Sequence, residues 1–220
     1  MDLFKYKNGK LYCENIAVDA LADEFGTPLY IYSANTIRRH IENFQKAFGA
    51  VDTTICYSVK VCSNINILKM VAGQGEAFDV VSGGELFRVI QAGGDPSRVV
   101  YAGVGKTDNE IRYAIEQGIG YFNIESEAEL ENIISIASDM GKVVKCALRV
   151  NPDVDPKTHT YTSTGKKESK FGVDIERAIS VFETYGRSAS IKLCGIHLHI
   201  GSPVYTVEPY VEAITKTLLM

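Results

Sequence analysis

The amino-acid sequence predicts an α/β fold, a (β/α)8 TIM-like barrel of which about six βα units are present. Short β-branched runs, typical of buried strands, alternate at close spacing with segments of helical character. Such alternation is typical of a parallel sheet built from right-handed βαβ units, which either closes into a barrel or stays open as a doubly wound sheet. Polar residues at the ends of the predicted strands favour the barrel, because these ends converge on one mouth there: Lys60, Ser82, Glu125, Asn151 and His199.

Most predicted helices are bounded by residues that favour a helix start or end. Ser126 and Glu129 have the spacing of a capping box, and Thr107 is a typical N-cap residue. Glycines follow most of the helices, where they allow the chain to leave the helix. The predicted strands are 53–60, 77–82, 99–102, 120–124, 145–151 and 191–200. The predicted helices are 65–72, 84–91, 107–116, 126–140, 174–185 and 206–219.

The first 34 residues do not follow this alternation. Residues 9–18 and 27–33 are strand-like, and the segment 34–48 has the pattern of an amphipathic helix packing on the barrel. We therefore divide the chain into an N-terminal segment, 1–34, and a partial barrel, 35–220. A full barrel needs about eight strands, so either the sheet is open or the sequence is part of a longer chain.

Composition excludes several function classes. The 220 residues carry a net charge of −4 with a pI near 5.6, so no basic footprint indicates nucleic acid or an anionic membrane as a partner. No signal peptide and no apolar run of transmembrane length is present. The five cysteines are scattered without a CxxC pair, which indicates neither zinc nor a disulfide framework. We expect a cytoplasmic protein.

Lys60 ends the first predicted strand of the barrel. Cys56, Ser58 and Lys60 share a face of this strand, because residues two apart in a strand point to the same side. One interpretation is a lysine whose stem lies on apolar surface while its ammonium reaches water. The other is an amine held away from water and able to form a Schiff base. The lysine alone leaves both interpretations open.

His197 and His199 have the same two-residue spacing at the end of the last predicted strand. Such a pair can bind a metal in a barrel, but a metal site needs further histidine or carboxylate ligands. The other two histidines, His40 and His159, lie in the N-terminal helix and in a polar loop. We therefore expect no metal. Buried core histidines, or one histidine acting on a flat ligand, remain as alternatives.

Three further segments have ordinary structural interpretations when taken singly. "FDVVSGGE", from Phe78 to Glu85, fits a tight loop between a strand and a helix. "GVGKT", 103–107, resembles the end of a phosphate-binding P-loop, but Val100 stands where the first glycine is required. Arg149 and Asn151 share a face of the fifth strand and precede a long polar loop, 152–170, which is either a lid or a surface insertion.

Seven segments, in this order and at this spacing, give a specific combination: "YSVKVCSN", "EAFDVVSGGEL", "YAGVGKT", "FNIESEAEL", "LRVNPDVDP", "SKFGV" and "GIHLHIGSP". Together they resemble the N-terminal half of the diaminopimelate decarboxylases. These are pyridoxal 5′-phosphate (PLP) enzymes of fold type III, in the ornithine, diaminopimelate and arginine decarboxylase family. The resemblance implies a PLP-binding barrel, and it implies that residues 1–34 contribute to a second, β-rich domain.

The resemblance also assigns roles to single residues. Lys60 would be the lysine that forms the Schiff base with PLP, and His199 would stack on the pyridine ring. Ser202 would help to hold the phosphate, and Arg149 would line the cofactor site. Asp79 and Glu85 match acidic positions near the lysine and the cofactor. Lys60 and His199 are thus the expected catalytic residues, and the expected cofactor-binding residues are Lys60, Asp79, Glu85, Arg149, His199 and Ser202.

The implied reaction is the decarboxylation of meso-2,6-diaminopimelate to L-lysine and CO2, the last step of lysine biosynthesis. The implied assembly is a homodimer with the active site at the interface and a small amino acid as substrate. The alternatives are a decarboxylase for arginine, ornithine or carboxynorspermidine, a non-catalytic PLP-binding barrel, and a metal-dependent hydrolase that uses the two histidines.

The sequence departs from the family pattern at Ser58, Val61 and Cys62 around the lysine, and at Pro203. These changes keep the lysine and the small face of its strand. By the resemblance, the family's phosphate loop and the glutamate partner of the pyridine nitrogen would lie beyond Met220. We therefore expect the sequence to be part of a longer enzyme, and this chain alone to be inactive.

Overall fold

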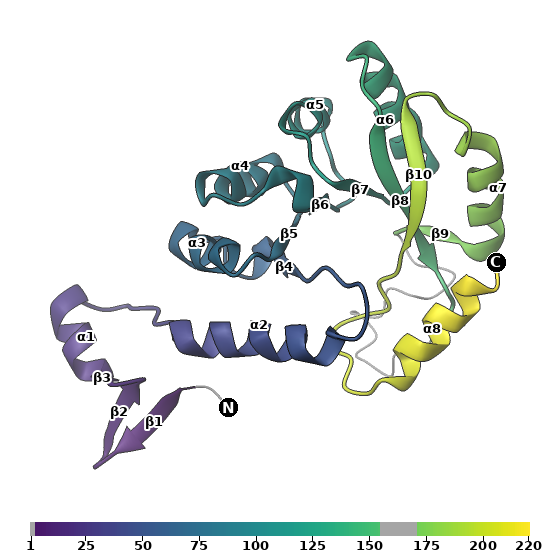
Figure 1. Cartoon of the computed structure of the whole chain (residues 1–220). Helices are drawn as coiled ribbons and strands as arrows, with labels where there is room; N and C mark the ends of the chain where they lie inside the picture. The colour runs from purple at the N-terminus through teal and green to yellow at the C-terminus, as the bar shows by residue number, and fades with distance from the viewer. Residues whose placement is uncertain (1–2, 155–170) are drawn as a thin grey trace.

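The computed structural model describes residues 3–154 and 171–220, and its centre is a curved sheet of parallel strands (Figure 1). The strands lie side by side in the order β10-β8-β7-β6-β5-β4, and β9 pairs with β8. All these pairings are parallel. The strands are β4 (Cys56–Ser58), β5 (Ala77–Val80), β6 (Val99–Tyr101), β7 (Tyr121–Ile124), β8 (Val144–Asn151), β9 (Val173–Asp174) and β10 (Ile191–His197).

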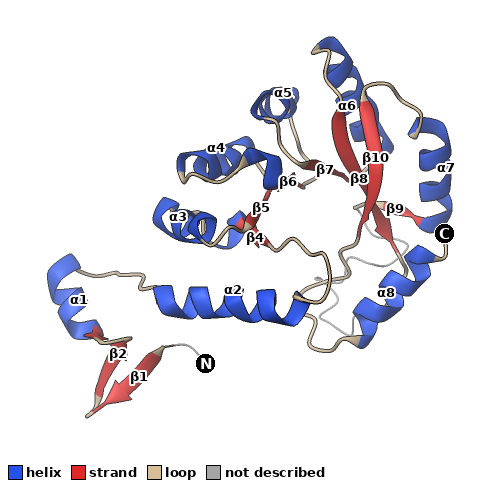
Figure 2. Ribbon diagram, viewed as in Figure 1, coloured by secondary structure: helices blue, strands red, loops and turns tan. Residues whose placement is uncertain are grey.

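This strand order decides between the two predicted architectures. A doubly wound sheet reverses its strand order at a switch point, whereas here each strand from β4 to β8 pairs with the next one along the chain. The helices that follow the strands lie on the outer side of the curved sheet (Figure 2). The arrangement is an arc of a (β/α) barrel, as predicted. Within the described residues, β4 and β10 are the two edges of this arc.

The predicted helices of the barrel are all present, with ends that differ by one or two residues. The side chains of Ser82, Thr107, Ser126 and Asp174 each cap a helix by accepting a hydrogen bond from a backbone amide of its first turn. The helices are α3 (Ile65–Gly73), α4 (Gly83–Gln91), α5 (Asp108–Gln117), α6 (Glu127–Asp139), α7 (Ile175–Tyr185) and α8 (Glu208–Leu218).

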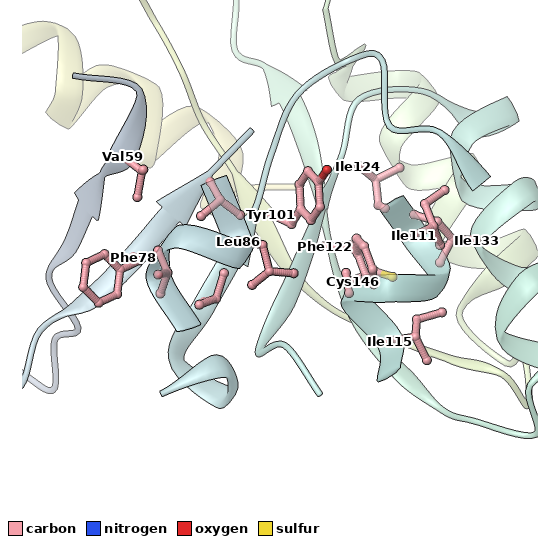
Figure 3. Close-up of a cluster of buried hydrophobic side chains, with 14 of the residues drawn as sticks. Val59, Phe78, Leu86, Tyr101, Ile111, Ile115, Phe122, Ile124, Ile133 and Cys146 are labelled. Carbon is pink, nitrogen blue, oxygen red and sulfur yellow. The ribbon is translucent and has the colours of Figure 1, made fainter. Parts of the chain in front are cut away.

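The hydrophobic core lies between the strands and this outer layer of helices (Figure 3). Phe78, Tyr101 and Phe122, on three neighbouring strands, are fully buried against helix residues such as Leu86 and Ile111. Burying one large apolar side chain contributes about 1.5–3 kcal/mol relative to leaving it exposed. Side chains alternate along a strand. The neighbours of each of these core residues on its own strand therefore face the inside of the barrel.

Two strand predictions at the carboxyl ends are wrong in their extent. The strand predicted over 53–60 is only β4, and Lys60 lies on a short 3-10 helix, Val59–Val61. The side chain of Lys60 is therefore not placed by the alternation of a strand. Similarly, β10 ends at His197, so His199 lies two residues beyond it. The pairing of the short strand β9 with β8 was not predicted.

The N-terminal segment forms a small antiparallel sheet of its own, β1 (Phe4–Lys7), β2 (Lys10–Cys13) and β3 (Ile16–Ala17), followed by α1 (Val18–Phe25). The strand predicted over 9–18 is thus interrupted by a turn, at which Glu14 has a φ of 55°. The strand predicted over 27–33 is wrong, because this stretch pairs with no strand in the described residues and Tyr30 remains 86% exposed. The predicted helix 34–48 is α2 (Ala34–Phe48), capped by Ser33. The assignment of residues 1–34 to a second domain stays a prediction.

No helix in the described ranges is both long and apolar enough to cross a membrane.

Candidate active site

A cavity of about 260 Å³ lies at the carboxyl ends of the parallel strands. Four of the six residues predicted for the site line it, namely Lys60, Asp79, Arg149 and His199. They come from segments up to 139 residues apart in the sequence, counted from position 60 to position 199. The other residues that line the cavity are Val81, Ala102, Gly103, Val104, Glu125, Phe171 and His197.

Lys60 and Asp79 lie at the ends of the first two strands of the arc. Ser58 pairs in register with Asp79 across β4 and β5, and its hydroxyl donates a hydrogen bond of 2.7 Å to Asp79 Oδ2. This contact holds the carboxylate beside the turn that carries Lys60. The lysine side chain is exposed, so the interpretation of an amine removed from water is not supported in the free chain.

Arg149 and Glu125 form a buried ion pair in the wall of the cavity. Arg149 Nη1 donates to Glu125 Oε1 at 3.0 Å and to Oε2 at 2.8 Å, and the side chains are only 8% and 5% exposed. The guanidinium also lies over the ring of Phe171, 5.5 Å from its centroid. Arg149 Nε is buried and makes no hydrogen bond within the described part of the chain. Arg149 thus retains a donor that no described residue uses.

The two histidines that line the cavity are kept neutral by their surroundings. Burial, together with the charges of Arg149 and His199, lowers the pKa of His197 to about 4. Burial, followed by Arg149 and Lys60, also lowers the pKa of His199. His197 Nδ1 is buried without a hydrogen-bond partner among the described residues. A neutral imidazole can donate at one nitrogen and accept at the other, so His197 has hydrogen-bonding capacity left for a ligand.

Two predicted site residues lie outside the cavity lining. Glu85 is the third residue of α4, and its carboxylate accepts a 2.8 Å hydrogen bond from the backbone amide of Val81, which does line the cavity. Glu85 therefore supports the wall rather than facing the cavity. Ser202 is exposed and follows β10 by five residues.

Asn151 ends β8, and its amide donates a 2.6 Å hydrogen bond to the backbone oxygen of Phe171. The bond holds the start of the described segment 171–220 against the strand. The long polar loop 152–170 was predicted to be either a lid or a surface insertion; only residues 152–154 of it are described, and residues 155–170 lie outside the described residues.

Sequence reasoning missed several of the lining residues. Glu125 was recognised as a polar residue at a strand end, and that signal could have assigned it to the site together with Arg149. His197 is not among the expected site residues, although it shares the cavity with His199. Val81 and Phe171 carry no chemical signal, because an apolar residue near a strand end is equally common in a core.

The residues described form no cluster of three or more histidine, cysteine or acidic side chains that could hold a metal ion.

An arc of a (β/α) barrel with an amine, a guanidinium, two carboxylates and two neutral imidazoles at its mouth is the construction of a small-molecule enzyme site. The family model described as "Pyridoxal-dependent decarboxylase, pyridoxal binding domain" matches residues 34–220. The chain belongs to this family, and its cofactor is PLP.

Two diaminopimelate decarboxylases are similar to this chain over nearly its whole length. This chain is 47% identical over 220 residues to the diaminopimelate decarboxylase of Haemophilus influenzae, covering 100% of this chain and 53% of the relative. It is 45% identical over 214 residues to that of Aquifex aeolicus, covering 97% of this chain and 50% of the relative. The chain thus spans about half the length of these curated relatives.

Solved structures give the same picture. The diaminopimelate decarboxylase of M. jannaschii in co-complex with L-lysine superposes with a TM-score of 0.91 at 33% identity, covering 99% of this chain and 52% of that one. The Helicobacter pylori diaminopimelate decarboxylase complexed with L-lysine gives 0.86 at 38% identity, covering 91% and 52%.

The cavity fits PLP in its chemistry. Its volume of about 260 Å³ is slightly below the range of small-molecule sites, about 300–1,000 Å³. Lys60 offers an amine for the cofactor's aldehyde. Arg149 Nε and His197 Nδ1 are buried polar atoms without a partner in the described residues, and such atoms usually have one. A flat, oxygen-rich and anionic ligand would supply those partners.

Proposed function

We propose that this protein decarboxylates meso-2,6-diaminopimelate to L-lysine and CO2. The observation that carries the proposal is the identity of 41–47% to diaminopimelate decarboxylases of several bacteria over 96–100% of the chain, combined with the cavity at the strand ends. The chain spans about half the length of those relatives. We therefore propose the activity for the protein in the form in which the cell makes it, and not for the 220 residues taken alone.

Lys60 is the residue that would hold the cofactor covalently through its amine, and this amine would also carry a proton to or from the reacting carbon. Its place on a short turn, with an exposed side chain, gives the amine the freedom that both tasks need. Asp79, fixed by Ser58, would supply a negative charge beside it.

His199 would present its ring to the flat face of the cofactor, and His197 would form a hydrogen bond with the cofactor. Both are suited to this because burial keeps them uncharged. Arg149, oriented by Glu125, would donate to a cofactor oxygen. When bound, PLP supplies an electron sink for the carbanion that loss of CO2 leaves. The role of Ser202 in holding the phosphate stays a prediction.

A substrate panel tests the proposal. CO2 release and amine product would be measured with meso-diaminopimelate, lysine, ornithine and arginine, for the wild-type protein and for Lys60→Ala. Lys69→Ala is the control, because Lys69 is an exposed lysine on α3 that does not line the cavity. We expect L-lysine from meso-diaminopimelate, a loss of at least about 10²-fold in Lys60→Ala, and no change in Lys69→Ala.

Two other outcomes of this assay would support a different function. Activity confined to ornithine or arginine would identify another basic amino-acid decarboxylase. Binding of PLP through Lys60 without CO2 release from any substrate would identify a non-catalytic PLP-binding barrel.

The proposal includes a cytoplasmic location and a homodimer whose active site lies at the subunit interface. Sedimentation of the purified protein and fractionation of cells test these two points. A monomeric active enzyme would contradict the second.

A further inference from the structure

The segment 103–107, which resembles an incomplete P-loop, carries a buried cation that the proposed chemistry does not use. Lys106 lies between β6 and α5, and its side chain is only 1% exposed. Its ammonium donates to the backbone oxygen of Gly103 at 2.8 Å, to that of Asn123 at 2.9 Å, and to the carboxylate of Glu129. All three hydrogens of the ammonium are thereby used.

Glu129 extends this contact toward the cavity. It is the third residue of α6 and is 11% exposed. Oε1 accepts from Lys106, while Oε2 accepts a 2.8 Å hydrogen bond from the backbone amide of Glu125. The carboxylate therefore joins the buried lysine to the residue that directly follows β7.

Both arms of this network reach the wall of the cavity. Gly103, held by Lys106, lines it directly. Glu125, whose amide is held by Glu129, lines it as well and binds Arg149 through its carboxylate. The backbone oxygen of Glu125 also accepts a 3.0 Å hydrogen bond from the amide of Gly172. A shift of Glu125 would therefore change its hydrogen bonds to both Arg149 and Gly172.

We propose that Lys106 and Glu129 form a buried positioning pair that sets the places of Gly103 and of the Glu125–Arg149 ion pair in the wall of the cofactor cavity. The inference rests on the proposed assignment of that cavity as the cofactor site. Buried ion pairs contribute little net stability because desolvation offsets their attraction, so stability alone gives a weak reason for this one.

The contrast with Glu85 supports a specific role. Glu85 occupies the same third position in α4 and likewise accepts from the amide of a residue that lines the cavity, Val81. A carboxylate that accepts from the backbone amide, without a buried lysine, is thus sufficient to cap such a strand end. The carboxylate of Glu129 differs, because within the described residues it also binds a buried lysine. Through Glu125 it is further connected to Arg149, the arginine of the cavity.

The test compares three variants with the wild-type protein as the cell makes it. Lys106→Met/Glu129→Gln removes both buried charges together, so neither is left uncompensated. Glu129→Gln is nearly isosteric and removes one acceptor, which keeps the test valid if the double variant fails to fold. Glu127→Gln is the matched control: the same substitution on the same helix, at a residue whose carboxylate pairs with exposed Arg177.

Two readouts separate positioning from general stability. The first is hydrogen exchange of the Gly172 amide in the cofactor-free protein, which reports the place of Glu125 without any cofactor. The second is the dissociation constant of PLP, from its absorbance change on titration. We expect exchange at Gly172 to accelerate at least tenfold and PLP to bind at least tenfold more weakly in Glu129→Gln and in the double variant. Glu127→Gln should match the wild type in both.

Wild-type exchange and wild-type PLP affinity in a folded Glu129→Gln protein would overturn the inference. Equal changes in Glu127→Gln would overturn it too, since the effect would then be general to α6. If exchange accelerates as expected but the wild-type protein does not bind PLP at the cavity, the positioning pair stands and the proposed function falls.

Discussion

Arg149 and Glu125 meet in the wall of the cavity, with one guanidinium nitrogen donating to both carboxylate oxygens at 3.0 and 2.8 Å. The two residues lie at the carboxyl ends of neighbouring strands, β8 and β7, and both side chains are almost completely buried. The arginine thereby has a fixed orientation, and its charge is balanced without being exposed to water.

Breaking this pair from one side should be costly. We expect Arg149→Met to lower the free energy of unfolding by about 3–5 kcal/mol, because it leaves Glu125 as an uncompensated buried charge. The double variant Arg149→Met/Glu125→Gln should recover a large part of that loss. Urea denaturation of the wild type and both variants measures these changes. Equal losses in the single and double variants would contradict the explanation that an uncompensated charge on Glu125 causes the loss.

His197 should make stability depend on pH in a defined window. Its pKa is about 4 in the folded chain, against an ordinary value of 6.5, because of its burial. Since the unfolded chain then binds more protons, the stabilisation is complete above pH 6.5 and is lost as pH falls toward 4. NMR titration of the imidazole should give a midpoint near 4, and His197→Gln should flatten the stability profile between these values. A midpoint at 6.5 or above would contradict the burial argument.

Gly172 should be intolerant of a side chain, for both backbone and packing reasons. It has a φ of +76°, and an added Cβ would lie 2.9 Å from both Cγ and the backbone oxygen of Arg149. We expect Gly172→Ala to cost about 2–5 kcal/mol, from left-handed strain plus overpacking, and to weaken PLP binding by displacing Arg149. Gly141→Ala is the control, since Gly141 has a φ of +62° and a Cβ added there would have nothing within 4 Å.

In that control, only the strain of the left-handed backbone remains, about 1–2 kcal/mol, and PLP should bind as to the wild type. Thermal and urea unfolding measure the stabilities, and PLP titration measures the affinity. If both alanine variants behave alike, the close contact with Arg149 has no energetic consequence.

The hydroxyl of Ser58 should contribute to stability only through its hydrogen bond to Asp79. Ser58→Ala removes the 2.7 Å hydrogen bond to the carboxylate, and we expect a loss of about 1–2 kcal/mol in stability. Ser135→Ala, at an exposed position on α6, should change stability by less than about 0.5 kcal/mol. Urea unfolding compares the two. A neutral Ser58→Ala would mean that water replaces the hydroxyl at Asp79.

The order of strands and helices in the barrel could be predicted from the sequence, because it depends on local signals. Hydrophobic runs, capping residues such as Thr107 and Ser126, and glycines at helix ends each act within a few residues. The stretch 27–33 shows the limit of such signals. Its aromatic and β-branched residues favour a strand, but a strand also needs a partner, and in the described residues none pairs with it.

Position at the predicted strand ends marked Lys60, Arg149 and the two histidines as candidates, but ordinary structural interpretations stayed open for them, and only the resemblance to the decarboxylases assigned them roles. Which of them share a cavity depends on the folded arrangement. Folding brings Lys60, Asp79, Arg149, His197 and His199 together and leaves Glu85 and Ser202 outside the lining. It also joins the buried lysine of the positioning pair to two partners outside its own loop, the backbone oxygen of Asn123 and the carboxylate of Glu129. The physical reason is that a hydrogen bond or an ion pair between distant segments depends on strand register and loop path, which no local pattern encodes.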